Sequence, residues 1–324
     1  MKAAVAKWDG LDFEDAVAAA GACTGLARTP AEWDASEQGR ILAGRPVVEV
    51  TRIGDSNPEP FKRGGDAPLD GVRVLDLTRV LAGPSCARTL AQYGAEVMAI
   101  SSPNLPSVPM FVSDTGHGKR AAFVDLATSD GRDTLRRLVR EGDVFSQSYR
   151  QGALERLGFG PLELARMRPG IVCTEINCYG HEGPWRTRPG WEQLGQTVTG
   201  MAVVHGGAEM PRLQPGAVTD YTTGFLAAFG TMVALERRAR HGGSYLVRVS
   251  LAQTAMWIRA MGLAGEDRLA ATQPLAAEEI AAWSLSRDTG FGPMTYLHPP
   301  VTLSATPARW TRPTVPLGTH AAVW

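Results

Sequence analysis

The sequence predicts an α/β fold with a parallel sheet. Between residues 72 and 176, short apolar runs typical of strands alternate with longer amphipathic runs typical of helices. Turn residues such as Gly94 and the triplet Ala82-Gly83-Pro84 separate these runs. Strand–helix–strand alternation of this kind indicates βαβ units with parallel strands. The 324 residues suffice for one main domain and a smaller one.

The segment that precedes this alternation carries weaker signals. The sequence predicts a helix over residues 13–20, a second helix that Pro30 opens, and a strand over residues 47–53. Residues 54–70 are dense in glycine, proline and charge, which predicts a linker. We therefore expect residues 1–53 to form a partial small-domain segment that packs on another part of the chain.

The alternating region itself predicts a Rossmann-like sheet. Its expected elements are, in order, a strand at 72–77, a helix at 82–93, strands at 96–100 and 121–126, a helix at 132–140, a strand at 143–147, short helices near 151–157 and 161–167, and a strand at 171–176. Ligands of such sheets bind outside the carboxyl ends of the strands. We therefore expect residues 78–84, 147–150 and 177–180 to lie near one another.

The second half of the chain completes this domain and then changes character. The sequence predicts a helix from Trp191, a long helix from Asp220 to Gly242-Gly243, a strand at 245–251 and a helix at 252–261. We expect the large domain to cover residues 71–262. Residues 263–290, rich in alanine and glutamate, predict a connecting helical segment, and the proline-rich residues 291–324 predict an extended C-terminal strap.

Composition argues against several classes of function. The 33 basic and 33 acidic residues cancel, so the net charge attracts neither nucleic acid nor an anionic membrane. The four cysteines form no CxxC pair and the six histidines no HxxxH spacing, so we expect no disulfide framework, no metal site and a reducing, cytoplasmic location. The first thirty residues lack the apolar core of an export signal, and the uncharged run 225–235 is too short to span a bilayer.

Asp220 stands out at the start of the long helix. It lies between Gly216 and Gly224, which permit close approach of a ligand. Three neighbouring hydroxyls are expected to surround its carboxylate: Thr219, Thr222 and Thr223. Five large residues recur at helical spacing and predict one apolar face: Phe225, Leu226, Phe229, Met232 and Val233. Taken alone, Asp220 is best interpreted as a helix N-cap.

A wider set of motifs gives Asp220 a second interpretation. The motifs are GVRVLDLTRVLAGPSCARTLAQYGAEV (71–97), GKRAAFVDL (118–126), DVFSQSYRQGALERLG (143–158), RPGIVCTEINCYGHEGP (168–184), and GGSYLVRVSLAQT (242–254) after the Asp220 helix. In this order they resemble the family III CoA-transferases, the CaiB/BaiF family, which includes formyl-CoA and carnitine CoA-transferases and the α-methylacyl-CoA racemases. The resemblance implies a Rossmann-like large domain, a small domain and two interlocked chains.

The resemblance also implies that Asp220 is the nucleophile of a CoA transfer. A carboxylate with an ordinary pKa of about 3.9 is ionised at neutral pH and attacks a thioester without a separate base. An aspartyl anhydride and then an aspartyl-CoA thioester would carry the transferred group. The expected substrates are an acyl-CoA and a carboxylic acid, with coenzyme A itself as the only cofactor.

The coenzyme A site is implied residue by residue. The turn 78–84 precedes a helix N-terminus, whose free N–H groups suit phosphate. The resemblance assigns nine residues to coenzyme A: Arg79, Val80, Ala82, Lys119, Arg120, Ser148, Tyr149, Arg150 and Arg156. Tyr149 is expected to pack on the pantetheine arm or on the adenine. Taken alone, Lys119 and Arg120 are more simply solvated surface charges.

Departures from the family pattern leave alternatives open near the reacting group. Trp191 stands where the racemases have histidine, and indole cannot exchange a proton at an α-carbon, so the racemase or isomerase alternative is disfavoured. Glu192, next to Trp191, keeps an acid at this position. We expect it either to contact the acceptor carboxylate, or to cap a helix or form an ion pair. Ser101-Ser102 replaces a usual Glu-Arg and removes one adenosine-phosphate contact.

Cys86, Cys173 and Cys178 are interpreted as core residues, and His117 and His181 as residues that order their loops.

The small domain departs further from the family pattern. Residues 3–50 resemble a part of the small domain that usually lies late in the chain, and no glycine-rich loop follows to cover Asp220. The small domain is therefore expected to be reduced or rearranged. An interlocked homodimer or a partner chain would complete it. A non-catalytic or degenerate CoA-binding subunit is the alternative to a transferase.

Overall fold

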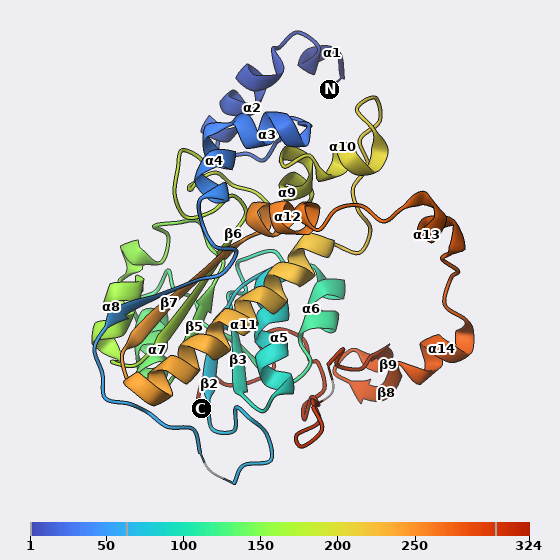
Figure 1. The fold of residues 1–324 in the computed structure, drawn as a ribbon. Coiled ribbons are helices and arrows are strands. Elements are labelled where there is room, and N and C mark those ends of the chain that lie inside the picture. Colours follow the sequence, from blue (N-terminus) through green and yellow to red (C-terminus); the bar gives the residue numbers. More distant parts are fainter. Residues whose placement is uncertain (1, 63, 302) are drawn as a thin grey trace.

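The computed structural model describes residues 2–62, 64–301 and 303–324. Within these ranges the chain forms a seven-stranded sheet, a two-stranded hairpin and the helices that cover them (Figure 1). The elements are α1 (Lys2–Val5), α2 (Gly10–Ala19), α3 (Pro30–Ala35), α4 (Glu37–Ala43), β1 (Glu49–Gly54), β2 (Arg73–Leu77), α5 (Ala82–Gln92), β3 (Glu96–Ser101), α6 (Pro109–Thr115), β4 (Lys119–Phe123), α7 (Ser129–Arg140), β5 (Val144–Gln147), the 3₁₀ helix η1 (Glu155–Leu157), α8 (Pro161–Met167), β6 (Val172–Asn177), α9 (Glu192–Val198), α10 (Met201–Gly206), α11 (Val218–His241), β7 (Ser244–Ser250), α12 (Leu251–Ala260), α13 (Glu266–Ala271), α14 (Ala277–Ala282), β8 (Ser284–Thr289) and β9 (Gly292–Leu297).

The large sheet has the strand order of a Rossmann fold. Its order is β1-β7-β6-β5-β2-β3-β4, and the strands from β2 to β7 are parallel. The chain moves outward from β2 in one direction through β3 and β4, and in the other through β5, β6 and β7. The switch between the two directions lies where Leu77 of β2 pairs with Gln147 of β5. This arrangement confirms the predicted α/β, Rossmann-like fold, and it places the expected ligand crevice at the carboxyl ends of β2 and β5.

The alternation along each strand builds two apolar layers, one on each face of the sheet. Strand residues that pack with α5 and α11 are Val74, Val97, Val144, Val172 and Val247. Strand residues that pack with α7 and α8 are Leu75, Leu77, Met98, Phe145, Cys173 and Leu246. Because successive side chains of a strand point to opposite faces of the sheet, a strand that is buried on both faces has a continuously apolar sequence.

Helix α11 packs on α5 through small residues, which differs from the predicted apolar face. Phe225 and Phe229 are 37% and 58% exposed, respectively. The buried face of the helix consists mostly of small side chains: Gly224, Ala227, Ala228, Gly230, Thr231 and Ala234. A Cβ at Gly224 would lie 2.6 Å from the carbonyl oxygen of Ala82. Close backbone approach therefore decides which face of α11 is buried, and hydrophobicity alone could not reveal that face.

No helix among the described residues combines the length and the apolarity needed to cross a bilayer.

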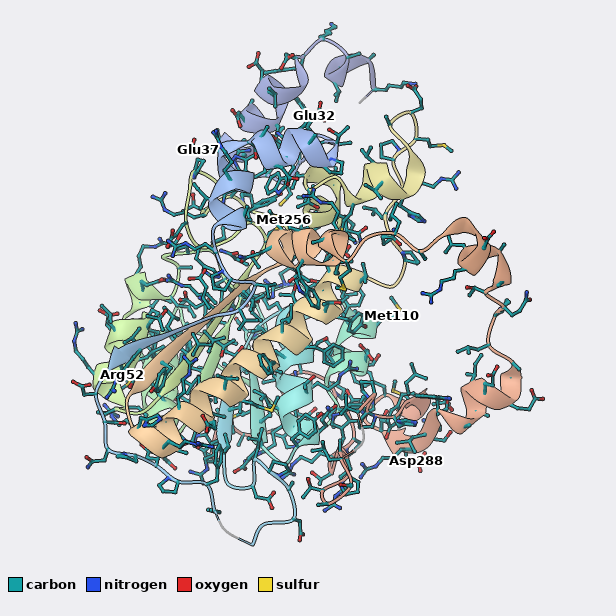
Figure 2. All side chains as sticks on the ribbon, viewed as in Figure 1. Glu32, Glu37, Arg52, Met110, Met256 and Asp288 are labelled. Atoms are coloured by element: carbon teal, nitrogen blue, oxygen red, sulfur yellow. The ribbon has the colours of Figure 1, made fainter. Side chains whose placement is uncertain are left out.

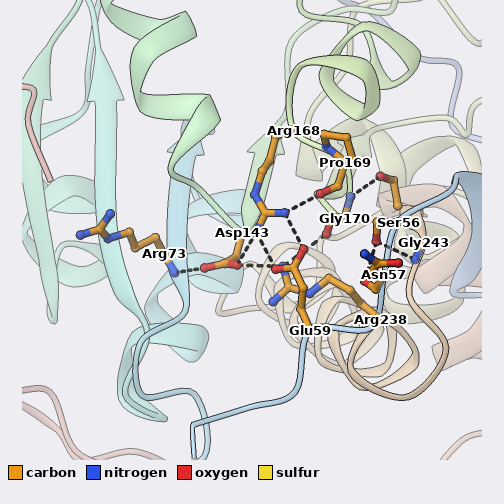
Figure 3. A network of polar contacts seen from close by, with 11 residues as sticks. Ser56, Asn57, Glu59, Arg73, Asp143, Arg168, Pro169, Gly170, Arg238 and Gly243 are labelled. Carbon is orange, nitrogen blue, oxygen red and sulfur yellow. Dashed lines mark hydrogen bonds and ion pairs between the residues drawn. The ribbon is translucent and has the colours of Figure 1, made fainter.

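The segment predicted as a linker, residues 54–70, is anchored by an ionic network (Figure 3). Arg168 donates two hydrogen bonds of 2.6 Å to the carboxylate of Glu59. Arg238, near the end of α11, lies 2.8 Å from Asp143, and Arg168 lies 3.3 Å from the same carboxylate oxygen. Since Asp143 immediately precedes β5, the network fixes the C-terminal end of α11 at the amino edge of the sheet. The first turn of the 24-residue helix therefore lies at the carboxyl edge.

The N-terminal helices pack on the loop that follows β6. The amide nitrogen of Gln38 donates to the carbonyl oxygens of Tyr179 and Glu182, at 2.8 and 2.9 Å. Strand β1 then pairs antiparallel with β7 and becomes one edge of the large sheet. The segment before the predicted linker thus contributes a strand to the large sheet, and its assignment as a partial small-domain segment stays a prediction.

The C-terminal part of the chain differs from the expected helix and strap. Strands β8 and β9 form an antiparallel hairpin around Gly290, where a helix to residue 290 and an extended segment from 291 were expected. Alternating polar and apolar residues and the Gly290 turn favour this hairpin. Helices α13 and α14 are short, and residues 267–271 and 277–282 are exposed (Figure 2). Residues 309–324 do run as a strap, in which the backbone N–H of His320 donates to Ala121 of β4 at 2.7 Å. The domain boundaries stay a prediction.

Gly224→Ala tests the close approach of α11 to α5. We expect this variant to lower the free energy of unfolding by about 2 kcal/mol, because overpacking against backbone outweighs the roughly 1 kcal/mol that alanine gains as a helix former. Chemical denaturation measures the change. Gly265→Ala is the control, since no described atom lies within 4 Å of a Cβ there, and it should change stability by less than about 0.5 kcal/mol. A Gly224→Ala variant more stable than the natural chain would contradict the packing.

Candidate active site

Asp220 occupies the first turn of α11 but does not cap it. The N-cap is Ala217, whose backbone is left-handed with φ of 49°, and no side chain caps the helix. Asp220 is the third helical residue, so its interpretation as an N-cap is wrong. Its side chain is only 5% exposed. No hydrogen bond to its carboxylate comes from the part of the chain that the structure describes.

Two of the three hydroxyl groups that were expected around Asp220 bind elsewhere. Thr219 donates to Oε1 of Glu192 at 2.9 Å. Thr223 donates to the hydroxyl of Thr254 on α12 at 2.7 Å. These bonds hold the first turn of α11 against α9 and α12. Neither hydroxyl therefore donates to the Asp220 carboxylate.

Glu192 is a buried acid in the first turn of α9. Its Oε1 accepts hydrogen bonds from the side-chain amide of Gln196 and from both the backbone N–H and the hydroxyl of Thr219. The N-cap of α9 is Trp191, and no ion pair of Glu192 occurs among the described residues. Of the alternatives for Glu192, the cap and the ion pair are thus absent from the described chain. The Glu192 carboxylate instead links α9 to α11 through Thr219, and it lies near Asp220.

Burial, and to a smaller extent the negative charge of Glu192, raises the pKa of Asp220 from its ordinary value to about 7. The expectation of a fully ionised carboxylate at neutral pH is therefore wrong. Near pH 7, protonated and ionised forms coexist. The ionised form lacks stabilising donors, which makes it a stronger nucleophile than a solvated carboxylate.

A cavity of about 240 Å³ lies at the carboxyl ends of β2 and β3, beside Lys119 and Ala121 in the first half of β4. Four of the residues expected to bind coenzyme A line it: Arg79, Val80, Lys119 and Tyr149. The sequence interpretation missed a second wall, formed by Phe111, Val112 and Thr115 of α6 and by Val315 and Leu317 of the strap. The available signal was Pro109 at a helix start followed by the apolar run 110–112. The strap residues carry no local sequence signal.

Lys119 forms part of the cavity floor and is not a surface charge. Its ammonium group lies 2.7 Å from the Asp76 carboxylate and donates to the carbonyl oxygen of Pro84 at 2.8 Å. Burial lowers the pKa of Lys119, and the charge of Asp76 opposes that effect. The ion pair joins β4, β2 and the start of α5 beneath the cavity.

The turn before α5 holds a strained residue at the cavity wall. Val80 has a left-handed φ of 70° and is 50% exposed. A β-branched side chain in that region costs conformational energy, and such strain concentrates at functional sites. The backbone N–H of Arg79 donates to the Ser148 hydroxyl at 3.2 Å, which connects the turn to the end of β5. The guanidinium of Arg79 donates to the carbonyl oxygen of Pro106.

The other residues expected to bind coenzyme A lie around the cavity and do not line it. Ala82 is buried as the first residue of α5, and Ser148 supports the turn. Arg120 lies 3.6 Å from Glu96, and Arg150 donates to the carbonyl oxygen of Gly21 at 3.1 Å. Arg156 is exposed in η1.

Three cysteines are buried, as expected for core residues, and of the two loop histidines His117 is buried and His181 is partly buried. Burial raises the thiol pKa of Cys86 to about 12 and also raises those of Cys173 and Cys178. These thiols are therefore poor nucleophiles near neutral pH. The His117 ring stacks between Tyr296 and Trp310, at centroid distances of 4.0 and 5.3 Å. The Nε2 atom of His181 lies 3.2 Å from the carbonyl oxygen of Val249.

Asp220 and the cavity lie at the same edge of the sheet and are joined through α5 and α6. Asp220 itself is not among the residues that line the cavity. Gly224, one turn along α11, contacts Ala82 at the start of α5, and Pro84 of the same helix lines the cavity. Tyr221 binds Asp114 of α6. The N-terminal turn of α5 therefore separates the carboxylate from the cavity.

Family comparison identifies the chain. The model of "CoA-transferase family III" matches residues 69–282. The chain belongs to this family. The match covers strands β2 to β7 of the large sheet and the Asp220 helix.

Individual relatives of the CoA-transferase family extend the comparison. "Acetyl-coenzyme A transferase nodX" of Hypoxylon pulicicidum is 36% identical over 252 residues, which cover 72% of this chain and 42% of that protein. A "Formyl-CoA:oxalate CoA-transferase" of Rhodopseudomonas palustris is 29% identical over 215 residues, 62% of this chain and 50% of that protein. The chain spans about half the length of the curated relatives it matches.

Solved structures show the same fold. A structure of Rv3272 from Mycobacterium tuberculosis has a TM-score of 0.57 and 30% identity, over 60% of this chain and 57% of that one. A mutant of Rv3272 has a TM-score of 0.69 at 22% identity, over 79% of this chain and 98% of that one. A CAIB/BAIF family protein from Brucella suis has a TM-score of 0.54 at 26% identity, over 70% of this chain and 65% of that one.

Asp220→Asn tests the buried carboxylate through stability. The pKa of Asp220 is higher in the folded chain than in the unfolded chain, so its ionisation costs stability. That cost is absent below about pH 4 and complete above about pH 7. We expect Asp220→Asn to raise the free energy of unfolding by about 2–4 kcal/mol at pH 8 and by less at pH 5.

Chemical denaturation at the two pH values measures this difference. The control is Asp133→Asn, because that carboxylate is 71% exposed and forms a surface ion pair with Arg136. It should change stability by less than about 1 kcal/mol at both pH values. Equal gains for Asp220→Asn at pH 5 and pH 8, or a loss at pH 8, would show that the carboxylate is not desolvated.

Proposed function

We propose that this chain transfers coenzyme A from an acyl-CoA donor to a carboxylic acid acceptor, with Asp220 as the nucleophile. The observation that carries the proposal is the Asp220 carboxylate itself. It is buried, it accepts no hydrogen bond from the described residues, and it lies at the carboxyl edge of the sheet of a family III CoA-transferase chain. A buried carboxylate without hydrogen-bond donors lowers the stability of the fold. A role in the reaction accounts for its presence in this proposal.

The proposed reaction needs only exchanges between carboxylates and a thiolate. A carboxylate oxygen of Asp220 attacks the thioester carbonyl, the C–S bond breaks, and CoA leaves as a thiolate. The thiolate attacks the aspartyl carbonyl of the resulting anhydride and releases the first acid as a carboxylate, leaving an aspartyl-CoA thioester. The acceptor carboxylate then repeats the two steps in reverse, which regenerates Asp220. No step transfers a proton, so no general base is required.

The N-terminus of α5 supplies electrostatic support in this proposal. Its N-cap, Leu81, offers no side-chain cap, and the N–H groups of Ala82 and Gly83 lie in the first turn. Pro84 has no backbone N–H, but a residue in the first turn of a helix has no hydrogen-bond acceptor within the helix, so no helical hydrogen bond is lost there. These groups suit a phosphate of coenzyme A or the oxyanion that forms at the thioester carbonyl.

The cavity is proposed to hold one end of coenzyme A. Its volume of about 240 Å³ fits a fragment and not the whole molecule. The rings of Tyr149 and Phe111 both line it, so a planar base can pack between apolar walls. Arg79 and the exposed Arg156 provide positive charge for phosphate. Four other residues expected at the coenzyme A site do not line the cavity: Ala82, Arg120, Ser148 and Arg150. In this proposal they support the cavity wall or contact coenzyme A outside the cavity.

A second chain is proposed to complete the active site. The chain spans about half the length of the curated relatives that it matches, and one relative is named as the "beta subunit" of a "Succinyl-CoA--L-malate CoA-transferase". An interlocked homodimer or a partner chain would supply the rest of the small domain. The alternative function is a non-catalytic CoA-binding subunit, which is favoured by the absence of Asp220 from the cavity lining.

Trapping of the anhydride separates the two functions. We expect incubation with acetyl-CoA or succinyl-CoA and hydroxylamine to convert Asp220 to a hydroxamate, because hydroxylamine cleaves both an aspartyl anhydride and an aspartyl thioester. Peptide mass spectrometry locates the modification.

Asp220→Asn should show no hydroxamate, and the surface control Asp133→Asn should react like the natural chain. Calorimetric titration with coenzyme A serves as the parallel measurement. Coenzyme A binding without any hydroxamate would contradict the transferase and support the non-catalytic subunit.

A further inference from the structure

Tyr221, next to Asp220 in the first turn of α11, takes part in a polar network outside the cavity. Its hydroxyl donates to Oδ2 of Asp114 on α6 at 2.7 Å. The other carboxylate oxygen of Asp114 accepts from the guanidinium of Arg88 at 2.7 Å, and Arg88 also donates to the backbone carbonyl oxygen of Asp114 at 3.1 Å. One carboxylate thus joins residues from α11, α6 and α5.

The C-terminal strap holds Arg88 in place. The guanidinium carbon of Arg88 lies 5.5 Å from the ring centroid of Trp310 and 5.9 Å from that of Tyr221. The indole N–H of Trp310 donates to the backbone carbonyl oxygen of Arg88 at 3.1 Å. The Arg88 side chain is only 14% exposed, so these interactions are largely shielded from solvent. Arg88 therefore has few alternative positions.

The helix fixed by this network is a wall of the cavity. On α6, Phe111, Val112 and Thr115 line the cavity, and Asp114 lies on the same seven-residue helix. The hydroxyl of Thr314 in the strap donates to the carbonyl oxygen of Val112 at 3.2 Å. The Tyr221 hydrogen bond is the direct connection between this wall and the turn that carries Asp220.

We propose that Tyr221 is a positioning residue, which through Asp114 and Arg88 holds the Asp220 carboxylate at a fixed distance from a donor bound against α6. This proposal rests on the proposed transferase function. Tyr221 does not touch the reacting atoms. It acts by restricting the first turn of α11, and a displacement of about 1 Å at that turn is enough to slow a reaction whose reactants must be held in contact.

Tyr221→Phe removes the hydroxyl and keeps the ring. We expect kcat for transfer from acetyl-CoA or succinyl-CoA to fall about tenfold, with KM for the donor unchanged within about twofold, because the defect is in the alignment of the nucleophile and not in binding. Asp114→Ala should lower kcat similarly. The double variant should fall no further than the more affected single variant, because both substitutions break one interaction.

Tyr245→Phe is the matched control. Its hydroxyl donates to the carbonyl oxygen of Gly242 at 3.1 Å, at the opposite end of α11. Loss of that bond should leave kcat at the level of the natural chain. A natural kcat for Tyr221→Phe, equal losses for the two Phe variants, or additive losses for Tyr221→Phe and Asp114→Ala would overturn the proposal.

Hydrogen exchange tests the network without requiring activity. Tyr221→Phe should increase amide exchange in peptides that cover residues 218–224 and leave residues 236–241 unchanged, whereas Tyr245→Phe should do the reverse. If the natural chain transfers no coenzyme A, the proposed function fails, and the exchange data still decide whether Tyr221 holds the turn. Unchanged exchange in residues 218–224 would overturn the positioning role.

Discussion

The desolvation of a single carboxylate is the constraint on which the rest of this site depends. Asp220 is 5% exposed, receives no hydrogen bond from the described residues and lies near the charge of Glu192, so its pKa rises to about 7. Ordinary helix starts use such a side chain to cap free N–H groups. Here a left-handed Ala217 starts the helix, and the neighbouring hydroxyls bind Glu192 and Thr254. The fold therefore keeps this carboxylate buried at a cost in stability.

Long-range contacts place Asp220 at the same edge of the sheet as the cavity. Arg238 and Asp143 fix the C-terminal end of α11 at the amino edge of the sheet, and the length of the helix carries its first turn to the carboxyl edge. At that edge, the strained turn at Val80 and the buried pair of Lys119 with Asp76 shape a cavity. Glycine at position 224 lets α11 approach α5 closely, so that only the N-terminal turn of α5 lies between the carboxylate and the cavity.

Local patterns predicted the sheet well and the site only in part. Strand alternation and turn residues were sufficient for the Rossmann-like order, because they act within a few residues. The buried face of α11 could not be predicted, since small residues such as Ala227 and Ala228 carry little hydrophobic signal and are selected by backbone approach. Val315 and Leu317 reach the cavity from the far end of the chain. The raised pKa of Asp220 likewise depends on burial and on Glu192, which is distant in sequence.

The most direct test of this account is the titration of Asp220 itself. Carbon-13 NMR of protein labelled at aspartate carboxyl carbons, with the resonance assigned by its loss in Asp220→Asn, measures the midpoint. The account predicts a midpoint at about 7 that moves to lower pH in Glu192→Gln, because that substitution removes the neighbouring negative charge. A midpoint of about 4, the ordinary value for a solvated aspartate, would contradict it.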